Sequence, residues 1–366
     1  TTSSSTPVQV TGLSGVTAIA AGLGHSMALK SDGTVWAWGY NGYGGLGDGN
    51  TTSSSSIVKA SGLTGVVSIA AGDYHSAAVK SDGTIWVWGY NGYGQIGNGT
   101  TTSSSVPTQT SNLTTAKLVG AGTSHTFVML QDGTIWAWGN NSDGQLGDGD
   151  TSQTLLPVAQ SACAAAPSAP GPPISAFRGR LAASQNFSLA VNGDGTVKAW
   201  GKNPNGELGD GTTVSELSPV QSAGVANAGT VAAGYYHSLT LLKSGAIWSW
   251  GYNGYGELAS GNTSSNPTPS PTPGTSGYVA VAAGQYHSLG LLSGGTVRAW
   301  GYNGYGQLGD GTTTQRGAPV QTVGISGVVA IAAGKDHSLA LKSDGTVWAW
   351  GYNGYGQLGN GGTTNS

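Results

Sequence analysis

The chain is poor in charge, in cysteine and in long apolar runs, and each shortage excludes a class of protein. Charged residues make up only 8% of its 366 residues, and the thirteen Lys and Arg form no basic run, so we expect no nucleic-acid partner. The single cysteine, Cys163, excludes an internal disulfide framework. No apolar stretch approaches the ~18 residues of a transmembrane helix, so we expect no membrane-spanning segment.

Glycine and large aromatic residues are abundant instead. The 65 glycines accompany only 14 prolines, which excludes collagen, where glycine recurs at every third position with much proline. Twelve Trp, fifteen Tyr and a hydrophobic content of 37% can form a core, so the chain is not globally disordered. In repeat proteins the length does not predict the number of domains, so the domain organisation has to be inferred from the repeat period.

Seven units repeat along the chain. A Trp-Gly-x-Asn marker recurs at Trp38, Trp88, Trp138, Trp200, Trp250, Trp300 and Trp350. A histidine precedes the marker in six units, at His25, His75, His125, His237, His287 and His337, and Phe187 takes its place in the fourth. Residues 161–175 account for the longer 62-residue spacing there and are expected to form a surface loop insertion. We therefore expect a single domain over residues 1–366.

The pattern within a unit is that of short strands. In the last unit, His337–Lys342 and residues 346–350 alternate in side-chain character, and Asp344-Gly345 between them is typical of a tight hairpin turn. Residues 328–332 form a further strand with small side chains that suit a place near a central axis, and residues 319–322 a weaker one. Three to four strands in each of seven units, without helical periodicity, predict an all-β seven-bladed β-propeller.

The two ends of the chain predict how the ring closes. The last unit stops before the Pro-Val-Gln strand that the other units carry, and the chain begins with that missing piece at residues 7–10. The N-terminal strand should therefore complete the last blade and remove the exposed strand edges.

The motifs His-Ser-Leu-Ala-Leu, Trp-Gly-Tyr-Asn and Gly-Gln-Leu-Gly resemble those of the regulator of chromosome condensation repeat family. The resemblance covers nearly the whole chain and implies a seven-bladed propeller. It does not imply one function, because the family includes a guanine-nucleotide exchange factor, plant light-sensing proteins and a bacterial β-lactamase inhibitor, and one scaffold can carry unrelated functions.

The repeated polar residues do not predict an enzyme, a cofactor or a metal site. Equivalent histidines on neighbouring blades should lie about 10 Å apart, the spacing of packed sheets, and one zinc ion needs its ligands within about 2 Å. We expect each histidine to be buried and bonded to local backbone. Ser26 and His25 are adjacent on a strand and point to opposite faces, which excludes a hydrolase triad.

Strand direction predicts one face for a partner. The variable pair before each histidine and the following Gly-Tyr-Asn-Gly-Tyr-Gly loop should share a face, with the Ser-Asp-Gly turns on the other. Tyrosines occur in five contiguous units and are interrupted at residues 140–143 and 202–205. The second tyrosine of each loop resembles the family consensus, and we expect it to have a structural role. The candidate partner-binding residues are Tyr40, Asp73, Tyr74, Tyr90, Tyr235, Tyr236, Tyr252, Gln285, Tyr286, Tyr302, Lys335, Asp336 and Tyr352.

Low charge and loops rich in Thr, Ser, Asn and Gly favour an extracellular or cell-surface location. The leading hypothesis is a non-catalytic extracellular scaffold that recognises a protein or a glycan through the tyrosine-bearing loops. A first alternative is a structural subunit of a surface layer, filament or adhesin that self-associates through the same loops. A second alternative is a guanine-nucleotide exchange regulator of a small GTPase, against which we note that residues 161–175 lack the alternation of a projecting β-hairpin.

Overall fold

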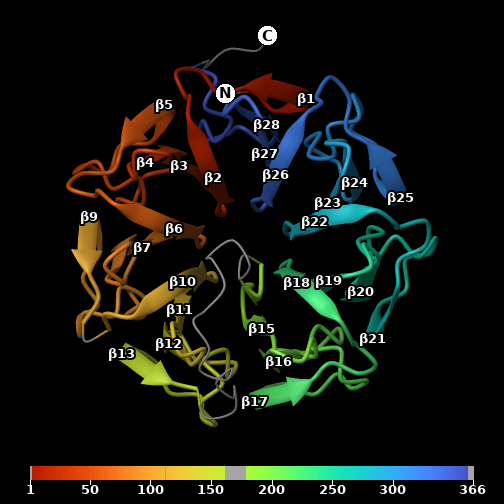
Figure 1. Ribbon diagram of the computed structural model, residues 1–366, viewed down its shortest axis with the longest axis horizontal. Helices are drawn as coiled ribbons and strands as arrows, with labels where there is room; N and C mark the ends of the chain where they lie inside the picture. Colours follow the sequence, from red (N-terminus) through yellow and green to blue (C-terminus); the bar gives the residue numbers. More distant parts are fainter. Residues whose placement is uncertain (1, 112, 161–178, 362–366) are drawn as a thin grey trace.

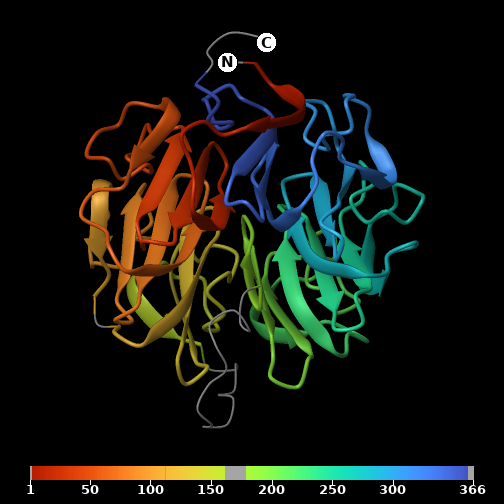
Figure 2. The same cartoon turned by 45° about the horizontal axis from the view of Figure 1, so that its top comes forward.

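The computed structural model describes residues 2–111, 113–160 and 179–361, and these residues form strands, turns and loops without a helix. Seven four-stranded antiparallel sheets surround a central axis, so the predicted seven-bladed propeller is confirmed (Figures 1 and 2). None of the described residues belongs to a helix long and apolar enough to cross a membrane. The predicted surface loop 161–175, which includes Cys163, lies outside the described residues.

We number the blades along the chain, and within each blade the first strand is the innermost (Figure 1). Blade 1 consists of β2 (Val16–Ala21), β3 (His25–Lys30), β4 (Val35–Gly39) and β5 (Ser54–Lys59). Blade 2 consists of β6 (Val66–Ala71), β7 (His75–Lys80), β8 (Ile85–Gly89) and β9 (Ser104–Gln109). Blade 3 consists of β10 (Ala116–Ala121), β11 (His125–Leu130), β12 (Ile135–Gly139) and β13 (Thr154–Ala159). Blade 4 consists of β14 (Leu181–Ala183), β15 (Phe187–Val191), β16 (Val197–Gly201) and β17 (Glu216–Gln221).

Blade 5 consists of β18 (Ala228–Ala233), β19 (His237–Leu242), β20 (Ile247–Gly251) and β21 (Asn266–Pro271). Blade 6 consists of β22 (Tyr278–Ala283), β23 (His287–Leu292), β24 (Val297–Gly301) and β25 (Arg316–Gln321). Blade 7 consists of β26 (Val328–Ala333), β27 (His337–Lys342) and β28 (Val347–Gly351), with β1 (Ser4–Gln9) as its outer strand.

The N-terminal strand closes the ring as predicted. β1 pairs antiparallel with β28, with Val8 opposite Ala349 and Gln9 opposite Trp348. The Val10 amide donates a further hydrogen bond to the Val347 carbonyl at 2.8 Å. The first and last segments of the chain thus share one sheet, and no blade is left with an unpaired outer strand.

The hairpin turns between the second and third strands of each blade lie on the face opposite the candidate loops. In blade 1, Gly33 has φ +76°, which an L side chain rarely adopts, and a Cβ there would lie 2.8 Å from the Gly65 amide nitrogen of blade 2. The Asp32 carboxylate accepts hydrogen bonds from the Thr34 amide at 3.0 Å and from its hydroxyl at 2.6 Å. The Asp-Gly turn is therefore both locally bonded and closely packed against the next blade.

The core lies between neighbouring blades. At the junction of blades 7 and 1, Leu339, Leu341 and Val347 pack with Ala28 and Trp38. The tryptophan of each Trp-Gly-x-Asn marker is fully buried, and each of these rings contributes a large apolar area to its junction. Packing between blades fixes where every loop emerges, and this positions the candidate site.

Candidate functional site

The two loops predicted to share one face do so in every blade. A backbone hydrogen bond joins them, for example from the Tyr40 amide to the Gly24 carbonyl at 2.8 Å and from the Tyr302 amide to the Tyr286 carbonyl at 2.7 Å. The blades without tyrosine have the same bond, from the Lys202 amide to the Asn186 carbonyl at 2.9 Å in blade 4. We call this surface the tyrosine face.

Each tyrosine loop folds around the buried asparagine of its marker. In blade 1, the Asn41 side-chain amide donates to the Asn50 and Thr52 carbonyls, both at 3.1 Å, and its oxygen accepts from the Leu46 amide at 2.9 Å. The equivalent Asn253 makes the same set of bonds in blade 5. A fully buried side chain thus holds both arms of the loop together.

A hydrogen-bonded latch anchors each loop to the next blade. The Ser76 hydroxyl of blade 2 donates to the Gly45 carbonyl of the blade 1 loop at 2.7 Å, and the Trp88 indole donates to the same carbonyl at 2.9 Å. The Ser76 oxygen also lies 2.9 Å from Nε2 of His25 in blade 1. Since serine has one proton and gives it to the carbonyl, the imidazole donates from Nε2.

This latch recurs with small changes around the ring. The histidine partners are Thr126 for His75, Ser188 for His125, Ser288 for His237, Ser338 for His287 and Ser26 for His337, at 2.8 to 3.1 Å. The histidines are buried as predicted, but the expected bond to local backbone is wrong as the main contact. The partner of each imidazole Nε2 is instead a side-chain hydroxyl of the next blade.

The Ser–His pairs across the seams lack an effective general base. All six imidazoles are buried, and the burial lowers their pKa values to about 3 or 4, so they are neutral at pH 7 and poor bases. Each serine hydroxyl is already donated to a carbonyl. Among the described residues no three His, Cys, Asp or Glu side chains are grouped so as to hold a metal ion.

Tyrosine rings form an unbroken arc over the loops of five blades. From Tyr93 in blade 2, successive ring centroids lie 4.8 to 6.3 Å apart through Tyr90, Tyr43, Tyr40, Tyr355, Tyr352, Tyr305, Tyr302, Tyr255 and Tyr252. The second tyrosine of one loop meets the first tyrosine of the next. Most of these pairs are tilted or edge-to-face, geometries that aromatic rings prefer. We call this the tyrosine arc.

Tyrosines from the variable pairs fill the inner side of the arc. Tyr74 lies 5.4 Å from Tyr40 and 5.5 Å from Tyr43. Tyr286 lies 5.1 Å from Tyr255 and stacks on Tyr236 at 5.5 Å. Every tyrosine of the chain except Tyr278, which is buried in blade 6, thus belongs to the face that the sequence predicted for a partner.

The second tyrosine of each loop is the more accessible one in most blades. Tyr43, Tyr93, Tyr305 and Tyr355 are 39 to 44% exposed, while the first tyrosines are less exposed. The first ring folds back over its own loop, so a Cβ on Gly42 would lie 2.2 Å from the Tyr40 hydroxyl. Sequence reasoning left the second tyrosines out of the candidate set, although their repetition in five loops was a usable signal.

The arc stops at blades 3 and 4. These blades carry Asn140-Asn-Ser-Asp143 and Lys202-Asn-Pro-Asn205 in place of the tyrosine sequence. Their loops keep the fold of the others, because Asn141 and Asn203 bond to their own loops as Asn41 does. The gap is therefore a change of surface chemistry on the same backbone.

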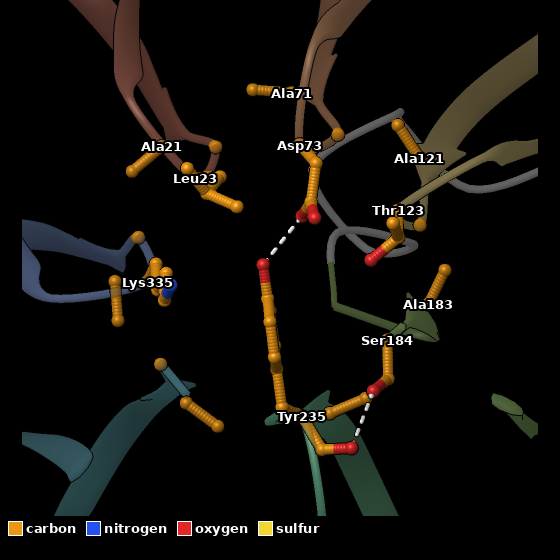
Figure 3. A pocket seen from close by; sticks show the side chains of 18 residues that line it. Ala21, Leu23, Ala71, Asp73, Ala121, Thr123, Ala183, Ser184, Tyr235 and Lys335 are labelled. Atoms are coloured by element: carbon orange, nitrogen blue, oxygen red, sulfur yellow. Dashed lines mark hydrogen bonds between the residues drawn. The ribbon is translucent and has the colours of Figure 1, made fainter. Parts of the chain in front are cut away.

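Two candidate residues meet across the mouth of the central channel instead of lying on the outer surface. The Tyr235 hydroxyl of blade 5 donates to the Asp73 carboxylate of blade 2 at 2.6 Å, and Lys335 of blade 7 points toward the same space (Figure 3). The surrounding cavity of about 60 Å³ is lined mainly by the Ala-Gly residues that end the inner strands. Tyr235 and Asp73 thus span the channel at the centre of the tyrosine face.

The mouth of the channel shifts the titration of these groups. Burial raises the pKa of the Asp73 carboxyl to about 6, and the Tyr235 hydrogen bond opposes this shift. Burial and the neighbouring Asp73 raise the pKa of Tyr235 well above its usual range. Burial also raises the pKa of Asp336, and nearby Lys335 opposes this. Of the remaining candidates, Gln285 and Lys335 are half-buried at the rim of the mouth.

Comparison with known proteins gives a consistent family. The family model of the RCC1-like domain matches residues 1–226 and 167–366. Human WBSCR16 is 22% identical, with 92% of this chain and 87% of that chain covered at a TM-score of 0.76. Prp20p from Saccharomyces cerevisiae, described with its binding properties to Gsp1p and histones, is 22% identical, with 93% and 84% covered at a TM-score of 0.75. Prp20 is also known bound to Kap60. No curated protein sequence matches.

These findings correct two predictions. The leading hypothesis of an extracellular scaffold for a protein or glycan, and the extracellular or cell-surface location, are contradicted by an RCC1-like family match and by solved relatives such as Prp20p. The structural-subunit alternative, a glycan partner and self-association gain no support. The prediction of location relied on the abundance of residues such as Asn and Thr. In the structure these residues form the hydrogen bonds that shape the loops and turns, as Asn41 and Thr34 do. The composition reports loop geometry and says nothing of location.

Proposed function

Since the chain belongs to the family of RCC1-like domains, we propose that it is a regulator that binds a small GTPase through its tyrosine face and promotes release of the bound guanine nucleotide. The observation that carries the proposal is the tyrosine arc, a rigid aromatic surface fixed by buried asparagines and by the latch. The proposed contact residues are the exposed rings of Tyr43, Tyr93, Tyr305 and Tyr355, together with the candidate residues at the inner rim.

Tyrosine suits protein recognition for a physical reason. Its large ring supplies contact area with few rotatable bonds, so little conformational entropy is lost on binding. In this chain that loss is smaller still, because each ring already contacts one or more neighbours at 4.8 to 6.3 Å. A preformed surface of this kind binds without paying for loop ordering.

Promotion of nucleotide release needs no catalytic side chain. A protein that binds the nucleotide-free form of a GTPase more tightly than the nucleotide-bound form weakens nucleotide binding by the same factor. The regulator therefore contributes differential affinity only. This agrees with a face of tyrosines and bonded loops. The related Prp20p is described as binding Gsp1p, and this supports the choice of partner class.

The test is release of a fluorescent guanine nucleotide from a panel of small GTPases that includes Gsp1p. We expect the chain to accelerate release from at least one of them by tenfold or more. The double variant Tyr43→Ala/Tyr355→Ala should reduce that acceleration about tenfold or more, because truncation of aromatic hot spots typically costs ~2 kcal/mol or more.

The matched control removes apolar side chains of similar exposure elsewhere. Val279 and Val329 are 53% and 54% exposed and lie on the inner strands, on the side of the channel away from the tyrosine face. The variant Val279→Ala/Val329→Ala should keep the full acceleration. Failure to accelerate release from any GTPase of the panel would refute the proposed function, and equal losses in both variants would move the contact away from the arc.

A further inference from the structure

Charge is divided unequally between the two faces of the propeller. Strand direction places eleven of the sixteen acidic residues in loops or strand ends of the tyrosine face: Asp48, Asp73, Asp143, Asp148, Asp150, Glu207, Asp210, Glu216, Glu257, Asp310 and Asp336. Of the basic residues within the described ranges, three accompany them: Lys202, Arg316 and Lys335. The tyrosine face is therefore strongly acidic, although the whole chain has a formal charge of only −3.

The opposite face has the reverse balance. The remaining acidic residues are the turn aspartates Asp32, Asp82, Asp132, Asp194 and Asp344. Nine described basic residues lie at the same end of the strands: Lys30, Lys59, Lys80, Lys117, Arg180, Lys198, Lys243, Arg298 and Lys342. Two of the aspartates are paired with lysines at 3.2 Å, Lys80 with Asp82 and Lys342 with Asp344.

Within the tyrosine face, the accessible acids gather in the gap of the arc. Blades 3 and 4 carry six of the eleven, namely Asp143, Asp148, Asp150, Glu207, Asp210 and Glu216, which we call the acidic sector. All of them except the buried Glu207 are half-buried or exposed. In the part of the chain that the structure describes, the basic residue beside them is Lys202, whose Nζ lies 4.0 Å from Oδ1 of Asp143.

Most acids under the tyrosine arc are neutralised or hidden. Asp310 pairs with Arg316 at 2.8 Å. Asp73 is buried against the Tyr235 hydroxyl, and Glu257 is fully buried. The face thus has two parts, a nearly uncharged aromatic arc over five blades and an acidic sector over the other two.

We infer that the partner of this face is a folded protein with a cluster of Lys and Arg beside an uncharged surface, and that the cluster lies on the acidic sector. The inference rests on the proposed function in that both use the tyrosine face. Complementary charge at the edge of an interface speeds association and fixes the orientation of the complex, whereas the apolar contacts hold it. Blades 3 and 4 would then supply orientation and the other five blades contact area.

The test neutralises the acidic sector and leaves its shape. The sector variant is Asp143→Asn/Asp150→Asn/Asp210→Asn/Glu216→Gln, in which asparagine keeps an oxygen that can accept the loop hydrogen bonds. The control variant Asp32→Asn/Asp82→Asn/Asp194→Asn/Asp344→Asn removes the same number of charges from the opposite face. Both variants have the same net charge, so a difference between them reports position.

Association with Gsp1p and with core histones, the two binders described for Prp20p, is measured by surface plasmon resonance from low salt to 1 M salt. At low salt the sector variant should associate with at least one probe about tenfold more slowly than the unmodified chain, with less than twofold change in dissociation. The difference in association rate between the two chains should vanish at 1 M salt, where the Debye length is about 3 Å. The control variant should stay within twofold of the unmodified chain.

Several outcomes would overturn the inference. They are equal association of the sector variant and the unmodified chain at low salt, an equal loss in the control variant, and no binding of either probe at low salt. Sedimentation could also show that the unmodified chain self-associates and that only the sector variant does not. The molecule bound to the acidic sector would then be a second copy of the chain, in contact through its basic face. Sector-dependent binding without nucleotide release refutes only the proposed function, and nucleotide release that the sector variant leaves unchanged refutes only the inference.

Discussion

Six seams of the ring carry the histidine latch, and the seam between blades 4 and 5 does not. There Phe187 occupies the histidine position, and the Ser238 hydroxyl bonds only to the Glu207 carbonyl, at 2.7 Å. Ser184 takes the place of a glycine found in the other six blades, and its hydroxyl donates to the Gly234 carbonyl across the seam. Every seam thus has an aromatic side chain at this position, and at the seam without a histidine Ser184 makes the side-chain hydrogen bond between the blades.

The glycine that Ser184 replaces is required wherever a histidine is present. A Cβ on Gly122 would lie 2.2 Å from Cε1 of His125, and on Gly234 it would lie 2.3 Å from Cε1 of His237. The histidine and the glycine are therefore one unit of packing, and blade 4 has exchanged both members. Tyr235, which follows the exchanged seam, also reaches across the channel to Asp73.

The largest expected difference between the two kinds of seam is in acid. A histidine whose folded pKa of about 3 or 4 lies below its unfolded value stabilises the fold above pH 6.5 and loses that contribution as the pH falls. Between pH 7 and 5 each histidine seam should lose about 2 kcal/mol, and the Phe187 seam nothing. Four buried carboxyls work in the opposite direction. The pKa values of Asp73 and Glu257 are raised to about 6 and 7, and burial also raises those of Glu207 and Asp336.

Because all six histidine seams act in the destabilising direction, we expect the free energy of unfolding to fall between pH 7 and pH 5. Urea midpoints followed by tryptophan fluorescence from pH 7.5 to 5 measure it. The variant His125→Phe gives blade 3 the residue found at this position in blade 4. It should reduce the pH dependence of the free energy of unfolding by the contribution of one histidine. A stability that stays constant over this range would contradict the account of the latch.

A smaller effect comes from the same serine position in the two kinds of seam. Ser288→Ala removes the 2.8 Å contact with His237 and the bond to the Glu257 carbonyl, and leaves the imidazole without a side-chain partner. Ser238→Ala removes only the bond to the Glu207 carbonyl, which still accepts from Trp250 at 2.7 Å. We expect costs of about 2–3 and about 1 kcal/mol, because a buried group left unpaired costs more than a lost bond. Equal costs in urea unfolding at pH 7 would show that the histidine contact adds nothing.

Sequence reasoning reached the features that repeat and missed those that depend on the curvature of the ring. Local patterns and strand direction can be read from each unit alone. They were enough to predict the strands, the closure by residues 7–10 and the face shared by the two loops. The hydroxyl partner of each histidine comes from the next blade, and Asp73 and Tyr235 are 162 residues apart. No local pattern gives the distance across a seam or across the channel, so these contacts required coordinates.

The smallest expected effect is a conversion of the exceptional seam into an ordinary one. Phe187→His alone should destabilise the fold, because the Ser184 Cβ stands where the other blades need a glycine beside the imidazole. The double variant Phe187→His/Ser184→Gly should lie within about 1 kcal/mol of the unmodified chain at pH 7, since one hydrogen bond across the seam replaces another. At pH 5 it should be about 2 kcal/mol less stable, because it carries a seventh buried histidine. If the single and double variants proved equally stable in urea at pH 7, the histidine and glycine would not be coupled, and the exchange in blade 4 would be two separate substitutions.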